Sequence, residues 1–565
     1  MTQESRMGRT VLPAEVEGDI LVCDEGLSFW GGVNAETGLI QDALHPQVGQ
    51  GLAGRILMMP TSRGSCTGSG VLLGLALAGR GPKALIFRED EDILTLGALI
   101  AGRMFGQNIA VLRLDAAGYA ALAGQHHARI GPDMIEAGPL RLPLARPGQV
   151  PLALTATDRR MLDGAEGEAV QLAMEIVQAM AAIQGARELV DVTRVHIDGC
   201  IYAGPAFLTF AERMAGMGAQ VKVPTTMNAI SVDHANWRLQ GVDPSFGEPA
   251  SRLANAYLRM GARPSFTCAP YLLPDRPGRD EVIAWAESNA VIYANSVLGA
   301  RTVKHPDFLD LCIALTGRAP RSGVYFDAGR TARRIVEVEA PAGADDAFWP
   351  MLGWLLGEAA PDRIPLLRGL EGTTPGGDDL KALCAAFGTT SAAPMLHVAG
   401  ITPEAASPPA PDADRRRILR ADFARAWRQF NAGPAEVGLV ALGSPHFSAP
   451  ECRAFLAALA GRHCAAAVRT IITLGRDTLA EIRADGTESA LRDAGVTIVA
   501  DLCWCSISEP VFPPEARVLM TNSGKYAHYG PGLSGRAVRF GSLRDCAEAA
   551  VQGRAPDGPP DWCRG

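Results

Sequence analysis

Short apolar runs alternate with longer amphipathic stretches in the first part of the chain. The predicted strands are 55–59, 83–87 and 109–114, and the predicted helices are 70–78 and 92–104. Strands that alternate with helices indicate a compact α/β unit. Two prolines and a glycine in 147–151 break regular structure, so we expect this unit to end near Arg146.

The rest of the chain repeats this alternation twice. A long amphipathic stretch, 157–183, predicts a helix, and a proline-rich run, 402–414, is typical of a linker. Beyond the linker we predict strands at 437–442, 468–474 and 496–502, and helices at 450–461 and 479–494. This order favours a parallel sheet with helices on both faces. The expected domains are therefore 1–146, 151–403 and 415–558.

Composition narrows the class of protein. Of the 565 residues, 47% are hydrophobic, which suits a globular protein with a large core. The net charge is −8 and no basic stripe stands out, which argues against a nucleic-acid partner. Residues 1–10 lack the apolar core of a secretory signal, and the longest apolar stretch, 71–78, is far below the roughly 20 residues of a membrane span. We expect a cytoplasmic protein without a membrane partner.

Twelve cysteines are many for a cytoplasmic protein, in which thiols stay reduced. Most are expected to be small buried hydrophobic residues. The sequence contains no CxxC pair, which excludes a zinc ribbon and a ferredoxin-type run. Any metal site must therefore combine cysteines that are distant in sequence.

Three polar segments are candidates for chemistry. The loop 61–70 has glycines that let the backbone approach a ligand, and it opens a predicted helix whose N–H groups suit an anion. The alternative is a serine-rich turn that caps the helix. The other segments are 267–301, rich in Asn, Ser and Arg, and 501–526, where Asp501 and Cys503 lie at a strand end. Ligands bind at such ends, although Ser and Asn also cap helices.

The order of these segments resembles the aconitase X family across nearly the whole chain. The matching stretches are 29–33, 54–55, 63–70, 162–167, His196, 224–228, Asp233, 268–271, 287–289, 295–301, 317–318, 400–404, 521–525 and Cys546. The N-terminal part is similar to the family's small swivelling domain, here fused to the large part.

The resemblance implies a multidomain, aconitase-like α/β fold. Three α/β regions would surround a cleft, and the N-terminal swivelling α/β domain would close it. It also implies an iron–sulfur centre held by three cysteines, for which Cys268, Cys503 and Cys546 are expected, with Cys505 as the competitor of Cys503. Cys546 lies just inside a predicted helix start, where a thiolate is stabilised. A [2Fe-2S] cluster is favoured for fused bacterial members, and [4Fe-4S] is the alternative.

Two chemistries are implied by the resemblance. Fused bacterial members dehydrate cis-3-hydroxy-L-proline to an enamine that becomes Δ1-pyrroline-2-carboxylate, and two-subunit archaeal members dehydrate phosphorylated mevalonate. The fused layout favours the first, with phosphomevalonate or another small hydroxy acid as the alternative. An iron-sensing or RNA-binding relative is the non-enzyme alternative. The partners expected are a small hydroxy or imino acid and, for the chain itself, a monomer or small homo-oligomer.

Dehydration needs a base, an acceptor for hydroxide, and donors for the carboxylate. We expect Ser65 to be the base, with its alkoxide stabilised by helix N–H groups and by Arg63. Thr67 and Ser69 are alternatives for this role. Lys525, Arg63 and Arg301 are candidates for the carboxylate. The expected substrate-binding residues are Gly64, Cys66, Thr67, Asn289, Ser296, Arg301 and Ser523.

Overall fold

The computed structural model describes residues 8–42, 45–145 and 151–564, and the chain divides into two compact units. Unit 1 is built from the chain up to Val195, with 203–223 and 305–322. Unit 2 is built from 196–202, 224–304 and 323–565. Both units mix helices and strands, which confirms the α/β class.

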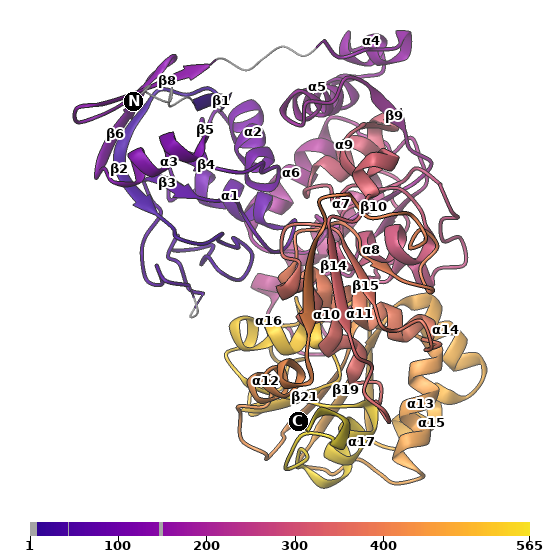
Figure 1. Cartoon of the computed structure of the whole chain (residues 1–565). Helices are drawn as coiled ribbons and strands as arrows, with labels where there is room; N and C mark the ends of the chain where they lie inside the picture. The colour runs from indigo at the N-terminus through magenta and orange to yellow at the C-terminus, as the bar shows by residue number, and fades with distance from the viewer. Residues whose placement is uncertain (1–7, 43–44, 146–150, 565) are drawn as a thin grey trace. The chain divides into compact units, whose positions relative to one another are not determined.

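Unit 1 begins with a closed barrel of strands in the order β1-β5-β4-β3-β2-β6-β7-β8, drawn from indigo to purple in Figure 1. Its strands are β1 (Gly8–Leu12), β2 (Val16–Val22), β3 (Ile56–Met59), β4 (Ala84–Phe87), β5 (Ala110–Leu114), β6 (His127–Ile130), β7 (Met134–Ala137) and β8 (Leu140–Ala145). Strands β2 to β5 run parallel. Every residue of β3 and β4 is buried, as expected for parallel strands covered on both faces.

Helices cover the barrel and continue unit 1 beyond it. They are α1 (Gly68–Leu77), α2 (Ile93–Phe105), α3 (Ala116–Ala123), α4 (Ala156–Leu162), α5 (Glu168–Ile183), α6 (Pro205–Gly216) and α9 (Leu309–Thr316), with the strands β9 (Leu189–Asp191) and β13 (Arg318–Pro320). Helix α1 packs against α2 and α6. Gly70 allows this approach, because a Cβ at that position would collide with the ring of Phe207 in α6.

Unit 2 contains three sheets. The first has the order β11-β10-β12 and the second the order β16-β15-β14-β17. Their strands are β10 (Val195–Ile197), β11 (Thr225–Met227), β12 (Ala284–Trp285), β14 (Arg334–Val338), β15 (Pro365–Arg368), β16 (His397–Val398) and β17 (Asp414–Ile418). The accompanying helices are α7 (Pro244–Arg259), α8 (Ser288–Tyr293), α10 (Phe348–Ala359), α11 (Gly377–Thr390) and α12 (Arg420–Phe430). Short helical turns are η1 (Pro270–Leu272), η2 (Ala294–Leu298), η3 (Gly323–Tyr325), η4 (Asp327–Arg330) and η5 (Asp561–Cys563).

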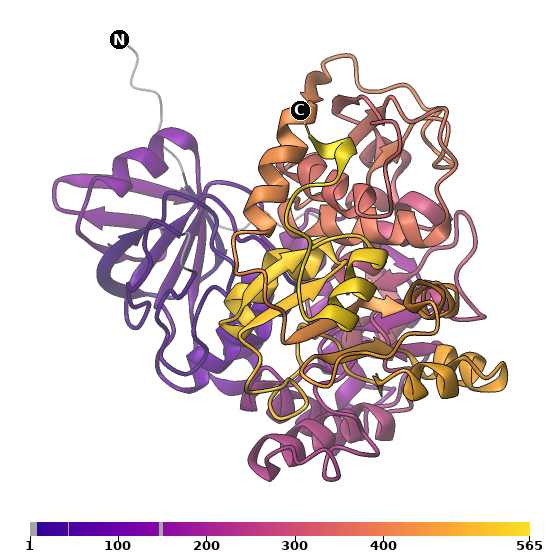
Figure 2. The same cartoon turned by 90° about the horizontal axis from the view of Figure 1, so that it is seen from below.

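The third sheet is parallel, in the order β20-β19-β18-β21-β22. Its strands are β18 (Leu439–Phe447), β19 (Arg469–Leu474), β20 (Val496–Ala500), β21 (Val518–Thr521) and β22 (Ala537–Phe540), orange to yellow in Figure 2. Its helices are α13 (Ala449–Leu459), α14 (Arg476–Ala484), α15 (Thr487–Asp493), α16 (Gly524–Ser534) and α17 (Leu543–Gln552). The chain order reverses between β18 and β21, and such a switch point is where α/β sheets bind ligands.

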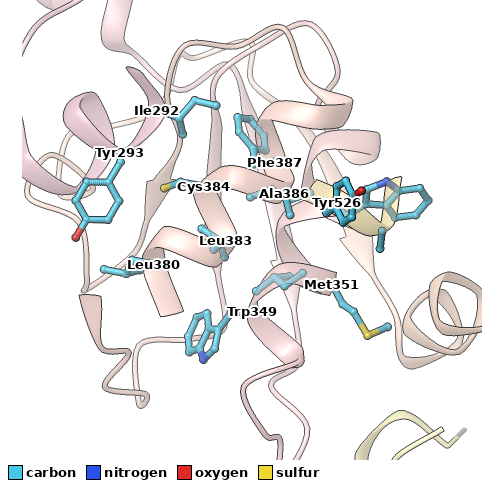
Figure 3. Packing of buried hydrophobic residues seen from close by; sticks show 14 of the residues in the cluster. Ile292, Tyr293, Trp349, Met351, Leu380, Leu383, Cys384, Ala386, Phe387 and Tyr526 are labelled. Atoms are coloured by element: carbon cyan, nitrogen blue, oxygen red, sulfur yellow. The ribbon is translucent and has the colours of Figure 1, made fainter. Parts of the chain in front are cut away.

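A large apolar cluster joins the second and third sheets of unit 2. Figure 3 shows part of it, with Phe387 and Leu383 of α11 near Tyr526 of α16 and Ile292 of α8. Asn289 of α8 and Lys525 of α16 belong to the site described below, and both helices pack against α11, which fixes them relative to one another.

Two of the predicted helices are each divided into two shorter helices in the structure. The predicted helix 157–183 is interrupted between α4 and α5, where Gly164 and Gly167 have positive φ angles of 77° and 99°. The predicted helix 479–494 is divided into α14 and α15 at Gly486, with a φ of 83°. Glycine adopts this left-handed backbone without steric cost, so it ends a helix that the apolar spacing alone would continue.

The predicted domain limits stay a prediction. Within the described residues, no helix is both long and apolar enough to cross a membrane.

Candidate active site

Three cysteine thiols gather in unit 2. Cys268 and Cys503 are buried together with Ala229, and Cys505 packs against them. The Cys503 thiol hydrogen-bonds with both of the others. The contact with Cys268 raises its pKa most, burial raises it further, and the contact with Cys505 opposes the rise. None of the cysteines in the described residues forms a disulfide.

The end of β20 explains why Cys503 and Cys505 lie together. If the strand continued, two residues at this spacing would share a face while Trp504 pointed the other way. The strand in fact ends at Ala500, and both cysteines lie in the turn that follows. In this turn both thiols lie in the same group.

The structure does not bring Cys546 to these thiols. Cys546 lies in the first turns of α17, as the sequence suggested, but its side chain is buried in a separate apolar cluster with Cys452 and Phe455. Burial raises the pKa of its thiol well above the usual value. Helix α17 turns this residue inward to pack the sheet, so the structure groups Cys268 and Cys503 with Cys505, the expected competitor, and not with Cys546.

A polar network borders the thiols. Lys525 Nζ donates to Glu287 Oε1 at 2.8 Å, and Asn289 Nδ2 donates to the same oxygen at 2.5 Å. Asn228 Nδ2 donates to Glu287 Oε2 at 3.3 Å and also to Asp198. Asp198 and Asn228 directly follow β10 and β11, and Glu287 lies just past β12. A carboxylate or carboxamide side chain therefore lies just beyond the end of each strand of the first sheet of unit 2.

Charge in this network is paired. Burial opposes ionisation of Glu287, but Lys525 and Asn289 outweigh it and hold the pKa of the carboxyl below its usual value. Burial likewise opposes the Lys525 ammonium, but Glu287 and the three thiols raise its pKa well above the usual range. Lys525 therefore carries a positive charge at neutral pH, beside the thiols.

Two further contacts link the network to the Cys268 turn. Asn289 Nδ2 donates to the Cys268 carbonyl at 3.0 Å, and the Tyr271 hydroxyl donates to Asn289 Oδ1 at 2.8 Å. The His446 backbone N–H donates to Cys268 Sγ at 3.3 Å. Burial lowers the pKa of the His446 ring to about 4, so the ring is neutral. Its Nε2 carries the proton, because it lies 2.6 Å from the Leu502 carbonyl, which can only accept.

The serine loop lies in unit 1, between β3 and α1. Ser65 Oγ donates to Thr67 Oγ1 at 3.0 Å and accepts from the Thr67 N–H at 3.3 Å. Thr67 and Ser69 are buried, and Ser69 Oγ donates to the Cys66 carbonyl at 2.9 Å. No side chain caps α1 at its N-cap residue, Thr67. Ser65 is partly exposed, as are Thr61 and Ser62 earlier in the loop, while the Cys66 and Thr67 side chains are buried.

Glu91 anchors this loop. Its Oε1 accepts from Ser62 Oγ at 2.6 Å and from the Leu94 N–H at 2.7 Å. Its Oε2 accepts from the Thr95 N–H and hydroxyl, both at 2.9 Å. The carboxylate therefore connects the loop to the start of α2. Gly64, with φ of 87°, is needed here because a Cβ would collide with the Ser28 hydroxyl.

Two arginines expected at the site have other partners. Arg63 pairs with Glu25 at 3.1 Å and with Asp42 at 3.6 Å, and its role beside Ser65 stays a prediction. Arg301 pairs with Asp280 at 2.9 Å and with Asp327 at 2.7 Å. Both arginines hold loops together through carboxylates that the sequence pattern did not associate with them.

Two serines expected to bind substrate hold the backbone instead. Ser296 lies in η2, a π-helical turn, and its hydroxyl accepts from the Leu396 N–H at 2.9 Å. Ser523 caps α16 by accepting from the Tyr526 N–H at 3.0 Å, and its hydroxyl donates to the Ser444 carbonyl. Ser523 thereby presents Lys525 in the first turn of α16, at the switch point of the third sheet.

The sequence pattern did not indicate that Glu287 pairs with Lys525, or that Asn228 and Asp198 extend the network from Glu287. Each follows a strand of only two or three residues, and strands this short leave little periodicity from which a strand end can be located.

The donor set of the thiol group suits a metal centre. The pKa values of the Cys503 and Cys505 thiols are each raised by a neighbouring thiol and by burial, and a metal cation offsets this cost by taking the thiolates as ligands. Among residues 8–42, 45–145 and 151–564, no three His, Cys, Asp or Glu side chains are arranged around the position of a single ion. Soft thiolate ligands without hard carboxylate ligands are typical of iron–sulfur clusters.

The α/β scaffold, with the thiol group and the charged lysine near strand ends, defines the class: a multidomain α/β protein whose polar site lies at strand ends. Family models of aconitase X match four parts of the chain, namely the swivel domain at 5–137, the first domain at 151–328, the second at 332–428 and the third at 437–552. The chain belongs to the aconitase X family, and it is a dehydratase, that is, a hydro-lyase.

Individual relatives agree with this membership. The chain is 50% identical to cis-3-hydroxy-L-proline dehydratase of Pseudomonas aeruginosa, over 98% of both chains. It is 46% identical to the enzyme of the same name from Hypocrea jecorina, over 97% of this chain and 95% of that one. It is 34% identical to the phosphomevalonate dehydratase large subunit of Methanothermobacter thermautotrophicus, over 68% of this chain and 94% of that one.

A solved structure supports the fold. Aconitase X of Thermococcus kodakaraensis superimposes with a TM-score of 0.65 at 29% identity, covering 71% of this chain and all of that chain. The aconitase X fold that the sequence led us to expect is therefore confirmed.

Proposed function

We propose that the protein dehydrates cis-3-hydroxy-L-proline to an enamine, which becomes Δ1-pyrroline-2-carboxylate. The observation that carries this proposal is the identity of 50% and 46%, over nearly the full length, to two dehydratases named for that substrate. The similarity to a phosphomevalonate dehydratase large subunit spans 68% of the chain, and it makes phosphomevalonate the second candidate.

Ser65 is the proposed base that removes the proton α to the carboxylate. The Ser65 hydroxyl is partly exposed. The Thr67 N–H already donates to Ser65 Oγ, and the Thr67 hydroxyl would donate to it once Ser65 is an alkoxide. Glu91 keeps the loop in place through Ser62. Hydrogen-bond donors aimed at the oxygen favour its ionised form, which is what a serine base requires.

Lys525 is the proposed electrostatic partner of the substrate. It is charged, buried and fixed by Glu287, and it lies beside the thiols. A preorganised ammonium stabilises negative charge that builds on the substrate carboxylate as the α-proton leaves. Asn289 and Asn228 hold both oxygens of Glu287, so Lys525 keeps one orientation.

Cys268, Cys503 and Cys505 are the proposed ligands of an iron–sulfur centre. When bound, such a centre with one open iron position supplies a Lewis acid toward a hydroxyl or carboxylate oxygen. We favour [2Fe-2S], with [4Fe-4S] as the alternative, and electron paramagnetic resonance of the reduced protein distinguishes the two. A cytoplasmic location and a monomer or small homo-oligomer remain predictions.

The test of the substrate is a panel assayed with anaerobically purified protein. We expect turnover of cis-3-hydroxy-L-proline and none of phosphomevalonate, with trans-3-hydroxy-L-proline as the stereochemical control. Turnover of phosphomevalonate alone would reject the proposed substrate and leave the family membership intact.

The test of the base is Ser65→Ala. We expect kcat to fall by about 100-fold or more, because general base catalysis contributes about 10²–10⁴-fold, while visible absorption and melting temperature stay near those of the wild type. Ser69→Ala, which removes a buried hydroxyl of the same loop, is the control and should lose stability rather than kcat. A Ser65→Ala protein with near-normal kcat would shift the role of base to Thr67.

A further inference from the structure

The two turns that carry the thiols share an unusual backbone feature. Phe266, two residues before Cys268, has a φ of 38°, and Asp501, two residues before Cys503, has a φ of 71°. Only five non-glycine residues of the described chain have a positive φ, and two of them stand at these equivalent positions. Such a backbone is costly for residues with a Cβ, so it persists only where surrounding contacts impose it.

Arg476 connects the two turns. It is the first residue of α14, and its Nε and Nη2 donate to the two oxygens of Asp501 at 2.7 and 2.8 Å. The same guanidinium lies over the ring of Phe266, 4.5 Å from the ring centroid. One side chain therefore holds both left-handed residues, by a bidentate ion pair on one side and by a cation–π contact on the other.

Hydrogen bonds fix the segment that starts at Asp501 at nearly every residue. The Ile230 N–H donates to the Asp501 carbonyl at 2.8 Å, and the His234 N–H donates to Asp501 Oδ2 at 3.3 Å. The Leu502 carbonyl accepts from His446 Nε2 at 2.6 Å, and Trp504 Nε1 donates to a carbonyl of β18 at 2.7 Å. The Cys503 turn is thus rigid, and it is connected to the Cys268 turn through His446 on one side and through Arg476 on the other.

We propose that Arg476 is a positioning residue that sets the spacing between the Cys268 and Cys503 turns, and thereby the retention of the metal centre. The inference rests on the proposed function, in which these thiols hold that centre. A lysine cannot replace Arg476 in this role, because an ammonium does not bond both carboxylate oxygens in one plane while lying flat on a ring.

The test compares Arg476→Gln and Arg476→Lys with the wild type. Three quantities are measured: iron per chain, visible circular dichroism of the bound centre, and the rate at which an iron chelator bleaches it without oxygen. We expect bleaching to be faster by about 10-fold or more in both variants, with a changed dichroism spectrum, since residues that orient metal ligands alter metal affinity by about 10–100-fold.

The matched control is Arg453→Gln. Arg453 likewise donates two hydrogen bonds to carboxylate oxygens, one to Glu481 at 2.7 Å and one to Asp485 at 2.8 Å, but on the surface of α13. The bound centre of the Arg453→Gln protein should bleach at the wild-type rate. Asp501→Asn is the second variant, which decides the question if Arg476→Gln does not fold, and it should bleach as fast as Arg476→Lys.

Each outcome bears on the inference. Wild-type bleaching rates and an unchanged dichroism spectrum in Arg476→Gln and Asp501→Asn, with a coloured wild type, overturn the inference alone. Equal acceleration in Arg453→Gln overturns it too, because loss of any surface ion pair would then suffice. A wild type without iron or colour overturns the proposed metal site as well as this inference.

Discussion

At the scale of single residues, a cysteine's function follows from whether other thiols share its surroundings. Cys505 lies against two other thiols, whereas Cys546 lies against aliphatic and aromatic side chains. Both residues are equally plausible ligands when each is judged by its local sequence. Their different neighbours lead to a direct prediction.

We expect Cys505→Ala to lose the visible absorption and most of the iron, because it removes one of three thiolates. Cys546→Ala should keep both and lose on the order of 1 kcal/mol of unfolding free energy, as a small change in a packed core does. Iron analysis, absorption spectra and thermal unfolding of the two purified variants check this. A folded but colourless Cys546→Ala protein would restore that residue to the site.

At the scale of elements, the junction of α2 with α5 buries the carboxyl group of Asp92. Burial makes the charged form of this group less favourable in the folded state than in the unfolded state. Asp92, just before α2, accepts from Nε2 of Gln184, at the end of α5, at 2.8 Å. Burial, and then the neighbouring charge of Glu91, raise the pKa of Asp92 to about 6. The folded state therefore binds this proton more tightly than the unfolded state does.

The pH dependence follows from that shift. A raised pKa contributes stability that is fully present below the ordinary value near 4 and is lost as the pH rises through about 6. Asp92→Asn removes the charge and keeps an acceptor for Gln184. We expect it to be more stable than the wild type above pH 6, on the order of 1 kcal/mol, with no such gain near pH 4. Thermal unfolding of both proteins from pH 4 to 8 measures it, and a difference independent of pH would contradict it.

At the scale of the whole molecule, the proposed metal ligands all belong to unit 2 and the serine loop to unit 1. A metal that binds only the folded form stabilises the unit that holds it. Units with separate cores need not unfold in one transition. Metal removal is therefore expected to affect the two units unequally.

We predict that a chelator lowers the melting transition of unit 2 and leaves that of unit 1 within error. The expected shift is on the order of 2–4 °C for each kcal/mol lost from a domain of ordinary size. Calorimetry of the holo and chelated protein, with Ser65→Ala as a variant altered only in unit 1, measures both transitions. An equal shift of both would show that the units unfold together.

Local pattern was sufficient for many of the elements. The runs 55–59 and 83–87 form β3 and β4, and 468–474 forms β19, because short apolar segments between turn residues have few alternatives to a buried strand. The α/β class and the aconitase X family were evident from the order of motifs, since that order spans several hundred residues. The helix breaks at Gly167 and Gly486 were missed, because glycine tolerates a helix interior and a helix end alike.

Only the tertiary structure decided which side chains meet. Cys268 reaches Cys503 and Cys505 across more than two hundred residues, and Lys525 reaches Glu287 across a similar separation. Such pairs depend on strand order, on where β20 ends and on the backbone of Phe266 and Asp501, and none of these is set by neighbours in sequence. The sequence by itself determined the elements, the family and the thiols available, because these follow from local chemistry and motif order. The choice of Cys505 over Cys546, and the ion pairs that occupy Arg63 and Arg301, follow from long-range packing, which local pattern does not encode.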